Sequence, residues 1–147
     1  MSSLYYEDVE VGSRFVVQGR TLSDMDIALF ALVSGDTHPI HTNAAYAAQT
    51  EFGQRIAHGP FGIALAIGLF GRIPEFSETA IAMLDVGQWK FYAPVFIGDT
   101  LQLEMTIAAK KLTKSGRGII TRHMKLVKQD DTIVQEGTSG LLIARRP

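Results

Sequence analysis

Residues 59–71 read GPFGIALAIGLFG, and this run decides which kind of fold the chain can adopt. It is uncharged and apolar on every side of a helix, which predicts a helix surrounded by protein. Pro60 suits the first turn of such a helix. Its 13 residues fall short of the roughly 20 needed to cross a bilayer, so we expect a buried helix and no membrane span.

Glycines interrupt this run at Gly62, Gly68 and Gly71. Each lowers helix propensity by roughly 1 kcal/mol relative to alanine. We expect the close approach of another backbone to compensate for this cost.

Beyond residue 80 the hydrophobic pattern changes from helical to alternating. LQLEMTI at 101–107 alternates strictly, which predicts a strand with one buried face. Three further segments read as strands, namely IAMLDVGQWKFYAP at 81–94, GIITRHMKLVK at 118–128 and IVQEGTSGLLIA at 133–144. The turns TKSGRG and KQDD connect the last three strands.

The segment before the apolar run predicts one strand and two helices. SRFVVQGR at 13–20 reads as the opening strand. TLSDMDIALFALVSG predicts a helix with Ser23 as its N-cap, Asp26 in its first turn and Gly35 at its end, and Asn43 is a candidate N-cap for a short helix after it. This order predicts an α+β fold in which an antiparallel sheet wraps around the central apolar helix.

Composition narrows the possible functions. A chain of 147 residues with 46% hydrophobic content predicts a single globular domain over 1–147. Its 14 basic and 15 acidic residues nearly balance, so we expect neither nucleic acid nor a membrane surface as a partner. The absence of cysteine excludes disulfides and thiolate chemistry. The acidic opening MSSLYYEDVEVG lacks the apolar stretch of a secretory signal, so we expect a soluble, cytoplasmic protein.

DTHPIH at 36–41 crowds a carboxylate and two imidazoles into one loop. Asp36, His38 and His41 could bind a metal ion, although no other metal-ligand spacing occurs in the chain. They could also form only a polar connection between helices. A third interpretation pairs Asp36 with His41 across Pro39 as an acid–base site that holds and deprotonates a water molecule. The spacing alone leaves these alternatives open.

Two motifs together resemble the family of MaoC-like dehydratases and (R)-specific enoyl-CoA hydratases, the hydratase-2 type. SGDTHPIHTNAAYA at 34–47 is similar to the family motif G-D-x-N-P-[LIV]-H, and FGQRIAHGPFGIAL at 52–65 contains its A-H-G motif. YYEDVEVGSRF at 5–15 and YAPVFIGDTL at 92–101 also resemble family segments. The resemblance implies a hot-dog fold, the antiparallel sheet around one helix described above.

The resemblance also implies an activity. The chain would be a hydro-lyase that interconverts trans-2-enoyl-CoA and (R)-3-hydroxyacyl-CoA, with Asp36 and His41 handling the water. The N–H of Gly59 would stabilise the thioester oxyanion, a role that suits the free N–H groups and the dipole at a helix start. We expect no cofactor and no metal ion.

This chain departs from the family pattern at two positions. His38 replaces the motif asparagine, so the hydrogen bonds of that asparagine either come from an imidazole or are lost. Ala64 stands where several short-chain members carry a serine. His38 and His58 are possible supporting residues, and His58 could simply hydrogen-bond the loop that shapes the oxyanion site.

Substrate contacts are harder to predict. Ile40, Phe61, Trp89 and Phe91 are candidates to bind the acyl group, although plain core packing would also explain such residues. Basic groups that could meet the phosphates of CoA are Lys90, Lys110, Lys111, Arg117, Arg145 and Arg146. Besides the acyl-CoA thioester, the resemblance implies a homodimer with its active sites at the subunit contact.

Two other functions remain open at this stage. A hot-dog acyl-CoA thioesterase would carry its acid on or near the central helix, and residues 60–71 contain none. A non-catalytic acyl-CoA-binding domain is the second alternative, which the unusual His38 keeps open.

Overall fold

The protein is described here by a computed structural model covering residues 2–147. Its sheet has six strands in the order β1-β4-β5-β6-β2, and β3 pairs with β6 as well. Every strand pair is antiparallel. The strands are β1 Arg14–Val17, β2 Ala80–Met83, β3 Gly87–Phe91, β4 Leu101–Leu112, β5 Gly118–Lys128 and β6 Ile133–Ile143.

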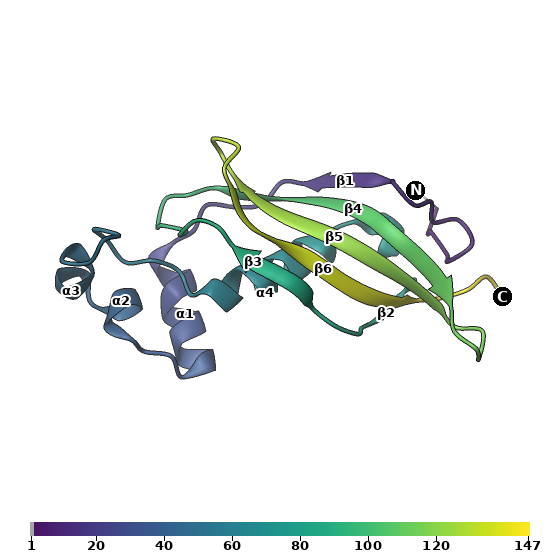
Figure 1. Ribbon diagram of the computed structural model, residues 1–147, viewed down its shortest axis with the longest axis horizontal. Coiled ribbons are helices and arrows are strands. Elements are labelled where there is room, and N and C mark those ends of the chain that lie inside the picture. Colours follow the sequence, from purple (N-terminus) through teal and green to yellow (C-terminus); the bar gives the residue numbers. More distant parts are fainter. Residues whose placement is uncertain (1) are drawn as a thin grey trace.

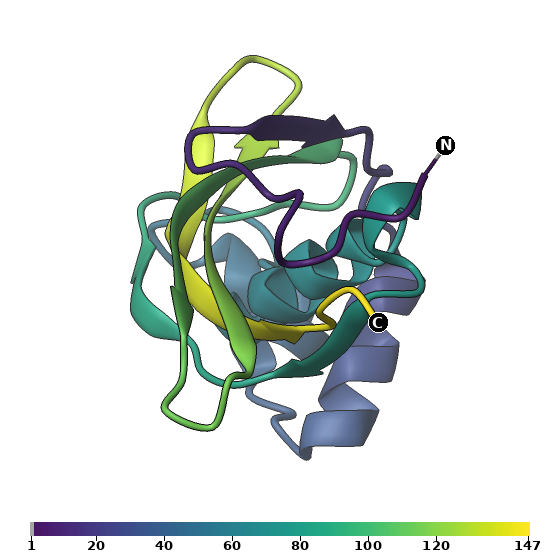
Figure 2. The same ribbon diagram turned by 90° about the vertical axis from the view of Figure 1, so that its right-hand side faces the viewer.

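The sheet curls around helix α4, Gly59–Phe70, so that the helix lies inside the curve (Figure 2). From Leu101 to Ile107, strand β4 buries every second residue as its sequence pattern predicts, and Leu103 and Ile107 are fully buried. Ala66 and Phe70 of α4 pack into the same core. The predicted α+β fold, an antiparallel sheet wrapped around a central helix, is confirmed.

One side of α4 is not covered within the chain. Pro60, Ala64 and Gly68 form an exposed stripe, whereas Gly62 and Ala66 are buried. The predicted central apolar helix is present, but its own chain leaves this side exposed, because a single sheet covers only one face of a helix.

The glycines of α4 also differ from the prediction. A Cβ at Gly62 would overlap the side-chain amide of Gln135, which comes from β6, and a Cβ at Gly68 would meet nothing within 4 Å. At Gly62 the close neighbour is thus a side chain from the sheet and not another backbone.

The predicted strand at 81–94 is interrupted, which corrects the sequence reading. It forms β2 and β3, and both pair with β6. Between them, the Asp85 carboxylate accepts a hydrogen bond from the N–H of Gly140 at 2.7 Å, and the N–H of Leu84 donates to the Gly140 carbonyl at 2.8 Å. The Asp85 side chain therefore accepts the hydrogen bond that a neighbouring backbone carbonyl would accept in a regular strand pair, and the pairing with β6 is irregular at this point.

Three helices lie beyond one end of the sheet, and the C-terminus lies at the opposite end (Figure 1). They are α1 Asp24–Ser34, α2 Pro39–Thr42 and α3 Ala44–Ala48, and a short 3-10 helix, Pro74–Phe76, follows α4. Ser23 and Asn43 stand at the predicted N-caps. Within residues 2–147, no helix combines the length and apolarity needed to span a bilayer.

Candidate active site

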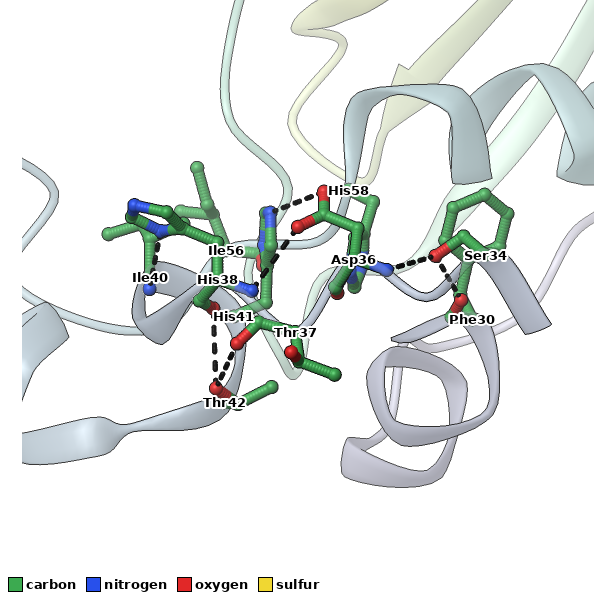
Figure 3. A network of polar contacts seen from close by, with 10 residues as sticks. All are labelled: Phe30, Ser34, Asp36, Thr37, His38, Ile40, His41, Thr42, Ile56 and His58. Atoms are coloured by element: carbon green, nitrogen blue, oxygen red, sulfur yellow. Dashed lines mark hydrogen bonds and ion pairs between the residues drawn. The ribbon is translucent and has the colours of Figure 1, made fainter. Parts of the chain in front are cut away.

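Two loops meet at the end of the sheet that carries the helices. Residues 36–41 follow α1, and residues 57–59 lead into α4. Gly35 turns the chain after α1 with a left-handed φ of 77°, which glycine adopts without strain. The loops therefore bring Asp36, His41 and His58 together (Figure 3).

His41 is a buried base, with 8% of its surface exposed. Its Nδ1 lies 2.7 Å from the carbonyl oxygen of Ile56. A carbonyl can only accept, so Nδ1 donates its proton and Nε2 of the neutral ring keeps a free lone pair. Burial lowers the pKa of His41, an effect that outweighs the Ile56 hydrogen bond and the Asp36 carboxylate, which both raise it.

The Asp36 carboxylate faces this lone pair. Its Oδ2 lies 3.7 Å from Nε2 of His41, and its Oδ1 accepts a hydrogen bond from the N–H of His38 at 3.2 Å. The side chain is 54% exposed, so solvent reaches it. A carboxylate and a neutral imidazole nitrogen are both acceptors, and a water molecule with its two O–H groups can donate to both.

His58 connects the two loops. It is 2% exposed, and its Nε2 donates to the backbone carbonyl of Asp36 at 2.8 Å. Its ring stacks on that of His41 with centroids 3.7 Å apart. Because Nε2 is the donor, the buried Nδ1 is an acceptor, and it has no partner among the described residues.

His38 caps the N-terminus of helix α2. Its Nδ1 accepts a hydrogen bond from the N–H of Ile40 at 3.1 Å, which makes it the side-chain N-cap of α2. Asparagine is among the best N-caps for the same reason, since its side-chain oxygen accepts from the first turn. An imidazole thus supplies the acceptor expected from the motif asparagine.

The positions of Asp36, His41 and His58 test whether this site could bind a metal ion. Asp36, His41 and His58 each place one ligand atom within 4.8 Å of the others, close enough for a ligand set. However, the planes of the two rings differ by only 22°. An imidazole lone pair lies in the ring plane, so nearly parallel rings direct their lone pairs side by side and not toward one ion. This geometry favours the acid–base interpretation.

Gly59 begins α4, directly after His58 as N-cap. Within residues 2–147, its N–H makes no hydrogen bond, as is usual in the first turn of a helix. A Cβ at this position would lie 3.1 Å from the ring of Phe91, so only glycine leaves this contact relaxed. The free N–H and the helix dipole together suit an anionic oxygen.

A cavity of about 270 Å³ opens beside Gly59. Phe91 and Tyr92 line it, and both are about half exposed. A larger groove of about 610 Å³ runs between α1 and α4 and includes Phe61, but none of Asp36, His41 and Gly59. The smaller cavity has Gly59 and Gln135 in its lining, but neither Asp36 nor His41.

The remaining predicted substrate residues do not gather around this cavity. Trp89 donates its Nε1–H to Gln135 at 3.0 Å and packs against the core, and Ile40 is half-buried in α2, where its carbonyl accepts from the N–H of Ile56 at 3.3 Å. Only Phe91, of the predicted aromatic residues, lies beside Gly59.

Basic residues at the C-terminus lie far from the site. Arg145 pairs with Glu7 at 2.9 Å, and Arg146 pairs with Asp8. Lys110 donates to the carbonyls of two N-terminal residues. The C-terminus and helices α1–α3 occupy opposite ends of the molecule (Figure 1). These groups therefore fasten the chain ends and do not surround Gly59.

Gln135 is the site neighbour that sequence reasoning missed. It is 3% exposed, and its Nε2 donates to the carbonyl of Gly59 at 3.0 Å. A polar residue at a buried position of a predicted strand could have marked Gln135 as unusual. The sequence does not show, however, how β6 is placed relative to α4, and this placement brings Gln135 to Gly59.

Comparison with known proteins gives a family match over most of the chain. Residues 9–129 match the family model described as "MaoC like domain". The chain is 36% identical to Protein MaoC of Klebsiella aerogenes, 37% to a 3-hydroxybutyryl-CoA dehydratase of Methylorubrum extorquens and 39% to an (R)-specific enoyl-CoA hydratase of Rhodospirillum rubrum. These matches cover 72%, 71% and 70% of this chain. They cover 31%, 64% and 69% of the relatives, so the match spans less than two thirds of the length of the first two.

Solved structures resemble the whole chain. A monoamine oxidase regulatory protein from Archaeoglobus fulgidus superposes with a TM-score of 0.92 at 27% identity, covering 100% of this chain and 98% of the other. The R-hydratase PhaJ1 from Pseudomonas aeruginosa superposes with a TM-score of 0.82 at 30% identity, covering 98% and 88%.

Proposed function

Because this chain belongs to the family of MaoC-like domains, we propose that it is a hydro-lyase that interconverts a trans-2-enoyl-CoA and the (R)-3-hydroxyacyl-CoA by adding or removing water. The names of the relatives, a 3-hydroxybutyryl-CoA dehydratase and an (R)-specific enoyl-CoA hydratase, support this reaction type. The observation that carries the proposal is the Asp36–His41 pair, two acceptors 3.7 Å apart at the mouth of a helix with a free N–H.

In the proposed mechanism the pair binds one water molecule. The water donates one hydrogen bond to Oδ2 of Asp36 and one to Nε2 of His41, which places its oxygen lone pairs toward the substrate. As the oxygen bonds to C3, His41 accepts the water proton, since its lone pair is free and its ring is neutral. That proton then passes from the pair to C2, so the elements of water are added without another reactant.

The electrons of the C2–C3 double bond move to the thioester oxygen while the bond to water forms. We place this oxygen at the N–H of Gly59, where a hydrogen bond and the positive end of the α4 dipole stabilise the developing enolate. The cavity beside Gly59 would hold the thioester. Elimination of water follows the same path in reverse.

We also propose that two copies pair. Strands β2 and β3 pair with β6 on one side and leave the sheet edge free on the other. Large apolar side chains are exposed along this edge, among them Ile81, Met83, Leu84 and Phe91. Helix α1 adds Leu32 and Val33, which are 78% and 83% exposed. An edge and a patch of this kind mark an interface between protein chains.

The activity is tested by hydration of crotonyl-CoA, followed by loss of the enoyl thioester absorbance. Asp36→Asn and His41→Gln should each lower kcat by at least the roughly 10²–10⁴-fold attributed to general acid–base catalysis. His123→Gln is the matched control, because His123 contacts Glu136 at 3.1 Å on another part of the sheet. Normal turnover in both site variants would refute the mechanism.

A thiol reagent added to the same assay distinguishes the thioesterase alternative. Release of free CoA at the rate of absorbance loss would identify hydrolysis of the thioester in place of hydration. Binding without any turnover, over short, medium and branched enoyl-CoAs, would identify a non-catalytic acyl-CoA-binding domain.

A further inference from the structure

We infer that Gln135 is a positioning residue that holds the N–H of Gly59 in the direction needed by the thioester oxygen. This inference rests on the proposed function and adds a residue of β6 to it. Gln135 lies 76 residues from Gly59 in sequence and belongs to neither motif loop.

The amide of Gln135 is fixed at both of its atoms. Its Nε2 donates to the Gly59 carbonyl at 3.0 Å, and its Oε1 accepts from Nε1–H of Trp89 at 3.0 Å. With 3% of the residue exposed, water does not compete for these bonds. Trp89 thereby determines which way the amide is oriented, and so which atom faces Gly59.

The hydrogen bond to Gly59 is more than the satisfaction of a buried carbonyl. A carbonyl in the first turn of an α-helix already accepts from the N–H four residues later. The bond from Gln135 is therefore an additional one, and it acts on the residue whose backbone is freest because it lacks a Cβ. It anchors the peptide that follows the free N–H.

Space for this amide is provided by glycine. A Cβ at Gly62 would overlap the Gln135 amide, and a Cβ at Gly137 would lie 2.5 Å from the Trp89 ring. Gly62 therefore lowers the helix propensity of α4 and in return admits the amide beside Gly59. Gly62 leaves room for Gln135 and Gly137 leaves room for Trp89, and these two side chains hydrogen-bond each other. This match indicates a specific arrangement and not general core packing.

The opposite side of Gly59 is held as well. The His58 ring donates to the Asp36 carbonyl at 2.8 Å, and the N–H of Ala57 donates to the Val95 carbonyl at 2.9 Å. Gly59 is thus anchored on one side, through His58, to the loop that carries Asp36, and on the other side, through Gln135, to β6. With Gln135 removed, only the first anchor remains, and the N–H direction is less well defined relative to Asp36.

Gln135→Met tests the inference, because methionine has a similar length and offers no hydrogen bond. We expect kcat for crotonyl-CoA hydration to fall about 10- to 100-fold, less than the loss of an oxyanion donor itself, with KM changed less than 3-fold. Gln102→Met is the matched control. Gln102 lies on the outer face of β4, and its amide donates a hydrogen bond to Glu104 at 3.4 Å.

A spectroscopic measurement separates positioning from a structural role. Butyryl-CoA labelled with ¹³C at the carbonyl cannot be hydrated, and its carbonyl stretching band reports the hydrogen bond made by the enzyme. In the wild type we expect this band at lower frequency than in water, and in Gln135→Met we expect it to return toward the value in water. A purely structural role would change thermal stability and leave the band of the bound ligand in place.

Gly62→Ala provides a second route that keeps Gln135. The added methyl group displaces the amide while it raises helix propensity, so we expect a reduced kcat and the same band shift in a protein that still folds. Wild-type kcat and an unshifted band in both variants would overturn the inference alone. Absence of hydration by the wild type would instead overturn the proposed function, and the inference with it.

Discussion

At the scale of single residues, the backbone decides the protonation of the site histidines. The carbonyl of Ile56 fixes the proton of His41 on Nδ1, the carbonyl of Asp36 fixes that of His58 on Nε2, and the N–H of Ile40 requires an unprotonated Nδ1 on His38. Each ring therefore has one tautomer and one task. The free lone pair of His41 faces the Asp36 carboxylate.

The lowered pKa of His41 predicts the acid side of the pH profile. A base must be unprotonated to accept a proton, so activity is lost only when the pH falls below the pKa of the folded protein. Because burial lowers this pKa, we expect the acid limb of kcat/KM to lie below about 6.5, the ordinary value for histidine. Initial rates of crotonyl-CoA hydration across pH measure it, and a limb above that value would contradict the assignment.

The capping role of His38 predicts the outcome of two substitutions. His38→Asn keeps a side-chain acceptor for the N–H of Ile40, so we expect stability and kcat close to those of the wild type. His38→Ala removes the acceptor and should lower the free energy of unfolding by about 1 kcal/mol, with a lower kcat because α2 carries His41. Urea unfolding and the hydration assay compare both, and equal behaviour of the two variants would exclude a capping role.

At the site, the sequence motifs lie in two segments that are close together in the chain. The spacing alone left their role open, and the family resemblance suggested a common site. The structure brings Asp36, His41 and His58 together, and Gly59 follows His58 at the start of α4. Gln135 could not be found in this way. Its position depends on the register of β6 and on the space left by Gly62, and neither is encoded in a short pattern.

At the scale of elements, α1 shows a prediction that succeeded for a local reason. Asp26 accepts from the N–H of Ser23 at 2.8 Å, as a capping-box residue should, and pairs with Arg20 at 2.6 Å. The predicted strand at 81–94 is a prediction that failed for a non-local reason. It is interrupted because Asp85 reaches Gly140 in β6, and the alternation of hydrophobic residues does not reveal a contact between residues so far apart in the chain.

Asp26→Ala is expected to destabilise the protein. The substitution removes the capping-box acceptor of the Ser23 N–H and leaves Arg20 without its carboxylate, so the free energy of unfolding should fall by about 1–2 kcal/mol at neutral pH. The Arg20 hydrogen bond lowers the pKa of Asp26, so this contribution is present above the unfolded pKa and is lost as the pH falls through the folded one. Urea unfolding at neutral and acidic pH checks both points, and Asp24→Asn is a control at an exposed neighbour.

At the scale of the whole molecule, apolar surface is exposed at several elements. The β2–β3 edge and helix α1 expose large apolar side chains, and α4 has an exposed stripe. The sequence predicted the apolar helix correctly but not its open face, because burial by a second copy and burial within one chain give the same pattern. A dimer that uses these surfaces would bury the face of α4 that the sheet of one chain leaves exposed.

Substitutions at the two sheet edges test which edge pairs. Ile81→Lys places a charge on β2, where Ile81 is 53% exposed, and lysine on an edge strand opposes pairing. We expect the molar mass in light scattering to fall from that of two chains to that of one. Val16→Lys makes the same change on β1, the opposite edge, where Val16 is 57% exposed, and should leave the mass unchanged. The reverse result would place the interface at β1.

The proximity of the two site loops in sequence has a consequence for the history of this fold. Asp36, His41, His58 and Gly59 all lie between residues 36 and 59, outside the strands that build the core. A single exchange of this segment between related chains would therefore carry the groups that we propose to handle water along as a unit, without a change in the strands. β6 limits such exchange, because an incoming helix start must still accept the hydrogen bond of Gln135.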